Sequence, residues 1–77
     1  MYVREVYSTM WRPGEELVVV QEAAGFYYFT RWLDRDGEIY KTEAAGPFDS
    51  LDKALRSANR WLHRIYGRPF YSRSYIE

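Results

Sequence analysis

Large apolar side chains occupy both odd and even positions of residues 26–33, which read Phe-Tyr-Tyr-Phe-Thr-Arg-Trp-Leu. Successive residues of a strand point to opposite faces of a sheet, so this run predicts a strand that is apolar on both faces. Shorter runs with strand character cover 2–8, 16–22 and 38–43. Turn residues separate the runs at Pro13-Gly14, Ala23-Ala24-Gly25 and Asp34-Arg35-Asp36-Gly37. The last of these suits a type I turn with a glycine bulge.

A helical period follows from residue 50 to residue 66. Apolar residues recur along one side of this segment: Leu51, Ala54, Leu55, Ala58, Trp61, Leu62 and Ile65. Asp49 or Ser50 would cap the helix, and Gly67 with Pro69 would end it. For the tail, residues 68–77, an edge strand and a loose arm are equal alternatives. The sequence predicts an α+β domain over residues 1–77. A three- or four-stranded antiparallel meander would be followed by one amphipathic helix packed on one sheet face.

The turn at residues 34–37 sets the register of the two strands beside it. Pairing Asp34 with Glu38 places Leu33 opposite Ile39 and Arg31 opposite Lys41. One face then carries Phe26, Tyr28, Thr30, Trp32, Tyr40 and Thr42. The other carries Tyr27, Phe29, Arg31, Leu33, Ile39 and Lys41. Arg31 and Lys41 would repel each other beneath a helix, so we expect the helix on the first face.

One helix is too narrow to cover such a sheet. Four strands at about 4.8 Å spacing are roughly 19 Å wide, whereas a helix with its side chains is about 10–12 Å across. We therefore expect the second face to stay uncovered and to mark a partner site or a homodimer seam. Its contact residues would be Tyr27, Phe29, Arg31, Leu33, Ile39 and Lys41. Trp11 and the tail would lie near its rim.

The composition narrows the class of protein. With 77 residues and no cysteine, the chain has room for one small core and no disulfide. An aromatic share of 19% supplies apolar area for that core. The first residues lack an apolar run of signal-peptide length, and the longest aliphatic run, residues 17–20, is far shorter than a membrane span. We therefore expect a soluble cytoplasmic protein without a membrane partner.

Charge is distributed unevenly along a chain whose formal net charge is zero. Residues 1–52 hold ten acids and five bases, a balance of −5, and residues 53–77 hold six bases and one acid, a balance of +5. The side of the helix opposite its apolar stripe carries a basic ridge of Lys53, Arg56, Arg60 and Arg64. This ridge is either a surface that binds phosphate or carboxylate groups or the solvated back of the helix, where late bases suit the helix dipole.

No motif for catalysis or metal binding stands out. His63 is the one histidine and cysteine is absent, so a metal site built on His or thiolate ligands is not expected. Residues 34–38 begin like a calcium loop, but position 45 is alanine where that loop needs a bidentate glutamate. No serine lies in a Gly-x-Ser-x-Gly motif. We expect no enzymatic activity, no cofactor and no metal.

A short meander, the junction Gly46-Pro47-Phe48-Asp49-Ser50 and one helix ending at Gly67 resemble the layout of small proteins carried by phages and mobile elements. Anti-CRISPR inhibitors, often cysteine-poor single domains, are among them. The resemblance is one of size and layout over the whole chain. It implies a non-enzymatic inhibitor that docks on a larger host protein or nucleoprotein complex. The alternatives are a small nucleic-acid-binding regulator that uses the basic ridge and a structural homodimer joined by the second sheet face.

Overall fold

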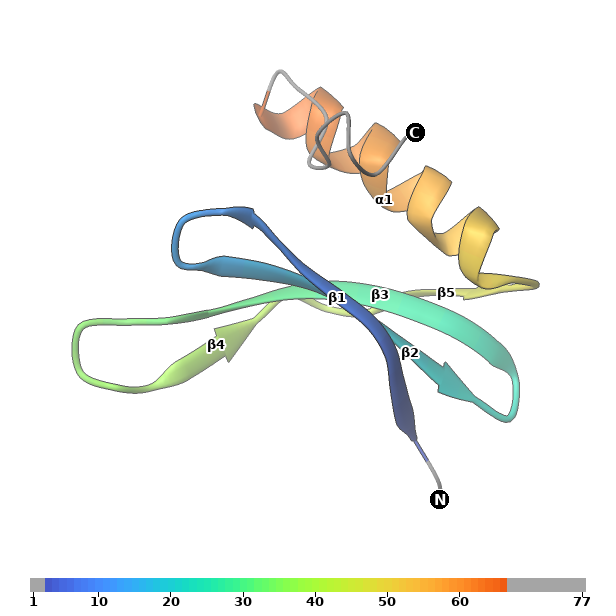
Figure 1. Cartoon of the computed structure of the whole chain (residues 1–77), viewed down its shortest axis with the longest axis horizontal. Coiled ribbons are helices and arrows are strands. Elements are labelled where there is room, and N and C mark those ends of the chain that lie inside the picture. Colours follow the sequence, from blue (N-terminus) through green and yellow to red (C-terminus); the bar gives the residue numbers. More distant parts are fainter. Residues whose placement is uncertain (1–2, 67–77) are drawn as a thin grey trace.

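The computed structural model describes residues 3–66, and the predicted tail lies outside them. Within this range the elements follow in the order β1 (Arg4–Arg12), β2 (Glu15–Glu22), β3 (Gly25–Leu33), β4 (Ile39–Lys41), β5 (Ala45–Phe48) and α1 (Leu51–Tyr66). Figure 1 shows an antiparallel sheet with the helix against it. The predicted α+β fold is confirmed.

β3 is the central strand of the sheet. Strands β1 to β4 are neighbours in chain order, and β2 pairs with β3 along its whole length. The other edge of β3 is shared, because β4 pairs with residues 31–33 and β5 pairs with Phe26 and Tyr28. The longest apolar run of the sequence therefore lies where strands flank it on both sides.

The turn between β3 and β4 has the predicted register. Leu33 pairs with Ile39, Trp32 with Tyr40 and Arg31 with Lys41. The amide of Asp34 donates to the carbonyl oxygen of Glu38 at 2.9 Å, and the amide of Gly37 donates to the carbonyl oxygen of Asp34 at 3.1 Å. The carboxylate of Asp34 also accepts the amides of Asp36 and Glu38, both at 2.9 Å. Asp34 thus fixes the turn through its side chain as well as its backbone.

The strand bounds differ from the predicted ones at β1, β4 and β5. The predicted strand over 38–43 is too long, because β4 covers only Ile39–Lys41. The predicted strand over 2–8 is too short, because pairing with β2 continues to Arg12 through a register shift between Met10 and Arg12. β5 was not predicted at all. Its Gly46 comes so close to β3 that a Cβ atom would lie 2.6 Å from the carbonyl oxygen of Phe26 and 2.8 Å from the ring of Tyr27. Glycine is needed for this approach, and its φ of +148° also disfavours other residues.

The hydrophobic core lies between α1 and one face of the sheet. Side chains from β2, β3 and the helix form it: Leu17, Val19, Tyr28, Ala54, Leu55, Ala58 and Leu62. The ring of Tyr28 stacks on Phe48 with 5.8 Å between centroids, and its hydroxyl lies 3.4 Å from Ser57 Oγ. The helix therefore covers the face that carries Phe26 and Tyr28, as predicted.

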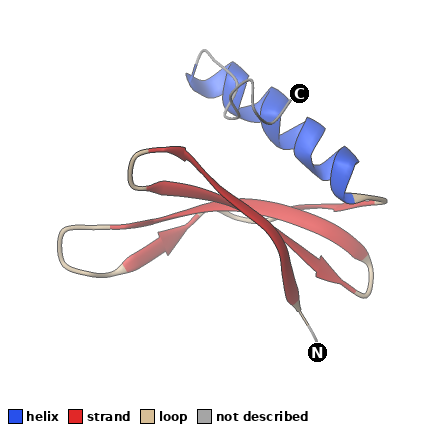
Figure 2. Cartoon of the chain, in the orientation of Figure 1, coloured by secondary structure: helices blue, strands red, loops and turns tan. Residues whose placement is uncertain are grey.

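Ser50 is the cap of the helix. Its hydroxyl accepts the amide of Lys53 at 3.1 Å, and its carbonyl oxygen accepts the amide of Ala54 at 3.1 Å. Of the two predicted caps, Asp49 instead pairs its carboxylate with Lys53 Nζ at 3.1 Å. Figure 2 shows the resulting two layers, with the helix on one side of the sheet and no described element on the other. We call this second side the open face.

Candidate functional site

The open face is built from alternate residues of four strands. Strand alternation and register place on it Glu5, Ser8 and Met10 of β1, Glu16, Val18, Val20 and Glu22 of β2, Tyr27, Phe29, Arg31 and Leu33 of β3, and Ile39 and Lys41 of β4. All six contact residues predicted from the sequence therefore lie together on this face. The structure adds the β1 and β2 residues, because their register with β3 could not be assigned from a turn motif.

Three large apolar side chains on this face are mostly exposed. Leu33 is 62% exposed, Ile39 70% and Met10 59%. Leu33 and Ile39 pair with each other at the end of the β3–β4 hairpin. Met10 lies on β1, in register with Glu16. Sequence reasoning missed Met10 because the predicted first strand ended before it.

The side chains at the centre of the open face are less exposed than Leu33, Ile39 and Met10. Val18 and Val20 are buried, and Phe29 and Tyr27 face them across the strand pair and are half-buried. An aromatic side chain stands taller than a valine, so β3 forms a ridge beside a floor of valines. Gly46 of β5 lies against the Tyr27 ring and explains part of its burial.

An ion network crosses the open face from β1 to β3. Arg31 Nη1 donates to Glu5 Oε2 at 2.8 Å, and Arg31 Nε donates to Glu16 Oε1 at 2.9 Å. The hydrogen bond from Arg31 lowers the pKa of Glu16 below its ordinary value, and the hydrogen bonds to Glu5 and Glu16 raise the pKa of Arg31. The predicted repulsion between Arg31 and Lys41 is offset by these two carboxylates, and Lys41 Nζ lies 5.4 Å from the centre of the Phe29 ring.

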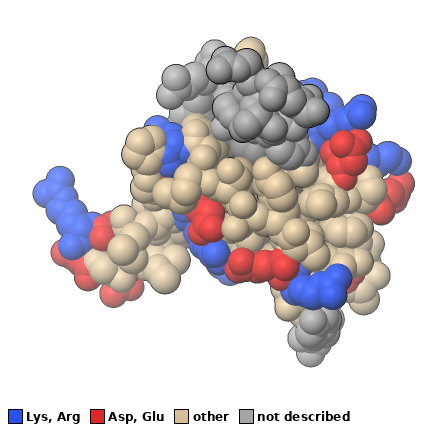
Figure 3. Space-filling model, in the orientation of Figure 1, with Lys and Arg blue, Asp and Glu red and all other residues tan. Residues whose placement is uncertain are grey.

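A groove of about 620 Å³ runs along the same face. Val20 and Phe29 line it together with five charged residues, the acids Glu5, Glu22 and Glu43 and the bases Arg31 and Lys41. Glu5 and Glu16 are bound to Arg31, whereas Glu22 and Glu43 form no ion pair with any residue in the described range. Lys41 is likewise in no ion pair within the described residues, so the groove combines apolar surface with a small excess of negative charge, three acids against two bases. Figure 3 shows charged side chains at both ends of the molecule and along the rim away from the helix, with uncharged surface between them.

The predicted basic ridge is partly neutralised. Lys53 pairs with Asp49 at 3.1 Å, and Arg56 Nε pairs with Asp52 at 2.9 Å. Arg60 and Arg64 form no ion pair with the residues that the structure describes, and His63 lies exposed beside them. The first half of the ridge thus resembles an ordinary solvated helix surface, with i,i+4 pairs.

Trp11 does not lie where it was predicted. Instead of standing at the rim of the open face, it is half-buried and packs against the core cluster. The register shift between Met10 and Arg12 explains this, because it interrupts the alternation of side chains along β1.

Two further classes of site are not found between residues 3 and 66. No group of three or more His, Cys, Asp or Glu residues there is arranged to hold a metal ion. No helix in the same range has the length and apolar character needed to cross a membrane.

Comparison with known proteins yields no relative. No protein-family model matches this chain, and neither the curated proteins nor the solved structures contain a match.

Proposed function

We propose that this chain is a non-enzymatic binding protein that docks through its open face onto a larger protein or nucleoprotein complex. The observation that carries this proposal is the set of exposed apolar side chains on that face, led by Ile39 and Leu33. Leu33 and Ile39 are paired neighbours, and adjoining exposed apolar side chains are typical of interaction sites. The resemblance to anti-CRISPR inhibitors favours an inhibitor of the phage type, acting in the cytoplasm.

Charge indicates the chemistry of the partner. The groove beside the aromatic ridge carries the unpaired acids Glu22 and Glu43 against one base outside any ion pair, Lys41, and residues 1–52 have a balance of −5. Opposite charges across an interface speed association and exclude wrong partners. A basic protein surface, such as one that normally holds nucleic acid, is the partner that this face suits best.

Two neighbouring residues of β4 test the proposal. Ile39 lies on the open face and is 70% exposed, while Tyr40 lies on the opposite face and is 48% exposed. Ile39→Asp should leave a folded protein and weaken capture of the host partner at least tenfold, about 1.4 kcal/mol. Tyr40→Asp places the same charge on the other side of the same strand, so it should retain the partner.

The measurement is quantitative capture from host lysate by immobilised wild-type protein and the two variants, with the captured proteins identified. Circular dichroism of each variant controls for folding. Equal capture by the wild type and by Ile39→Asp would exclude the open face as the docking surface. Loss of capture by both variants would show that a charge on either side of β4 prevents binding. Docking would then not be specific to the open face, which also contradicts the proposal.

The nucleic-acid alternative has less support than the four-residue ridge suggested. Lys53 and Arg56 are each engaged by an acid, so Arg60 and Arg64 remain as the unpaired cations of the described helix. A contact through two cations would give a log-log salt dependence of about 2, half of what four would give.

For the homodimer alternative, light scattering separates one copy from two.

A further inference from the structure

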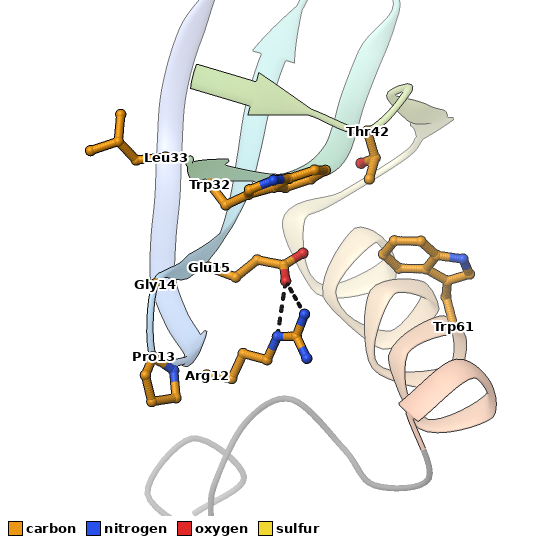
Figure 4. A pocket seen from close by; sticks show the side chains of 8 residues that line it. All are labelled: Arg12, Pro13, Gly14, Glu15, Trp32, Leu33, Thr42 and Trp61. Carbon is orange, nitrogen blue, oxygen red and sulfur yellow. Dashed lines mark hydrogen bonds and ion pairs between the residues drawn. The ribbon is translucent and has the colours of Figure 1, made fainter. Parts of the chain in front are cut away.

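A second concave surface lies on the helix side of the sheet, where three elements end close together. It is a cleft of about 590 Å³ between the tip of the β1–β2 hairpin, the end of β3 and the helix. Figure 4 shows Trp32 of β3 and Trp61 of α1 on two sides of it, with Glu15 of β2 reaching in between. Leu33 belongs to both the cleft and the open face, but the inference uses Glu15, Trp32 and Trp61 on the helix side of the sheet, so it does not rest on the docking proposal.

Glu15 is an unusual residue to find in this position. It is only 6% exposed, although carboxylates are rarely buried in proteins of this size without full compensation. Arg12 supplies part of that compensation, with Nε at 3.0 Å and Nη2 at 2.9 Å, but both atoms bind the same oxygen, Oε1. No side chain of the described residues donates to Oε2, and Figure 4 shows this oxygen directed into the cleft.

Arg12 also lines the cleft and neutralises Glu15 at Oε1, so the group left for a ligand is the acceptor Oε2, which a positively charged donor satisfies most strongly. Indole rings attract cations over their faces, and a carboxylate in an apolar cleft attracts them more strongly than one in water. The same protein already shows this preference, since the guanidinium of Arg12 lies 4.8 Å from the centre of the Trp11 ring. An ionised carboxylate or phosphate ligand has no hydrogen to donate to Oε2.

We propose that this cleft binds the side chain of an arginine or lysine from a partner protein. The aliphatic stem of that side chain would pack between Trp32 and Trp61, and its charged end would donate to Glu15 Oε2. An extended cation of this kind matches both the apolar walls and the buried carboxylate. A stacked nucleobase would fill the walls but brings no charged donor to Oε2.

The test uses the full chain and two acetylated peptides, Gly-Gly-Arg-Gly-Gly and the same peptide with citrulline in place of arginine. Citrulline has nearly the same shape but no charge, so the comparison needs no mutation. The readout is the pair of indole N–H signals of Trp32 and Trp61 in nuclear magnetic resonance spectra, assigned with Trp32→Phe and Trp61→Phe. The arginine peptide should shift both signals saturably and bind at least about tenfold more tightly than the citrulline peptide.

Substitution of Glu15, with Glu38 as control, provides a second test. Glu15→Gln should reduce affinity for the arginine peptide to that for the citrulline peptide. Glu38→Gln, a matched change at the exposed β3–β4 turn, should leave it unchanged. Equal affinity of the wild type for both peptides, or no saturable shift with the arginine peptide, overturns the proposal. If Glu15→Gln fails to fold, the comparison of the two peptides on the unmodified protein decides alone.

Discussion

At the scale of single residues, Arg31 organises the open face. Its guanidinium joins Glu5 on the edge strand to Glu16 on β2. Arg31 and Glu16 are both half-buried, so their attraction is screened less than that of a fully exposed pair. The network joins the charged centre of this face in the free chain, which would lower the entropic cost of the binding that we propose.

Glu16→Gln should destabilise the protein at neutral pH and have no effect in acid. The hydrogen bond from Arg31 lowers the pKa of Glu16 in the folded protein below its ordinary value of 4.5. Its stabilising effect is therefore present above pH 4.5 and is lost as the pH falls through the folded-state pKa. Since such a pair contributes about 0.2–1 kcal/mol, we expect a melting temperature lower by about 1–8 °C at pH 7 and equal to that of the wild type near pH 2.5.

Thermal unfolding followed by circular dichroism at the two pH values measures this difference. Glu38→Gln is the control, because the side chain of Glu38 forms no ion pair with the described part of the chain. A melting temperature of Glu16→Gln that stays below the wild type by the same amount at both pH values would show that its ion pair is not responsible.

At the scale of elements, the helix start shows how one polar residue is chosen over its neighbour. The sequence offered Asp49 and Ser50 as equal caps. In the structure Ser50 accepts the amide of Lys53, while Asp49 binds the exposed ammonium of the same residue. A cap hydrogen bond satisfies a backbone amide that has no partner within the helix, whereas an exposed ion pair adds little.

Ser50→Ala should therefore lower stability by about 1 kcal/mol, which corresponds to about 4–8 °C in melting temperature. Asp49→Ala should cost less than about 0.5 kcal/mol, because it removes only an exposed i,i+4 pair. Urea unfolding of both variants compares them directly. If Asp49→Ala is the more damaging substitution, the cap has been assigned to the wrong residue.

Some elements could be predicted from the sequence because their signals are local. The β3–β4 register follows from Asp34 and Gly37, and the helix follows from its apolar period. β5 was missed because Gly46 and Pro47 read as a junction and the strand pairs with β3 at only Phe26 and Tyr28. The ion network around Arg31 and the Trp32–Trp61 cleft were also missed. Each joins residues from three elements, and its formation depends on the register or packing between elements that no short motif specifies.

At the scale of the whole molecule, one face of the sheet is covered by the helix and the other, the open face, is not. The helix packs on β2, β3 and β5, and the opposite side of the sheet has no described element over it. Large aromatic side chains shelter Val18 and Val20 from water. Leu33, Ile39 and Met10 stay exposed. The exposed group is the part that a partner would bury.

Accessibility of methyl groups to a soluble nitroxide tests this coverage most directly, in a sample that light scattering shows to hold one copy. The methyl signals of Leu33 and Ile39 should broaden strongly, while those of Leu17 and Leu62, which are fully buried, should not. Protection of Leu33 and Ile39 equal to that of Leu17 and Leu62 would show that the protein covers its own open face, and would contradict the account.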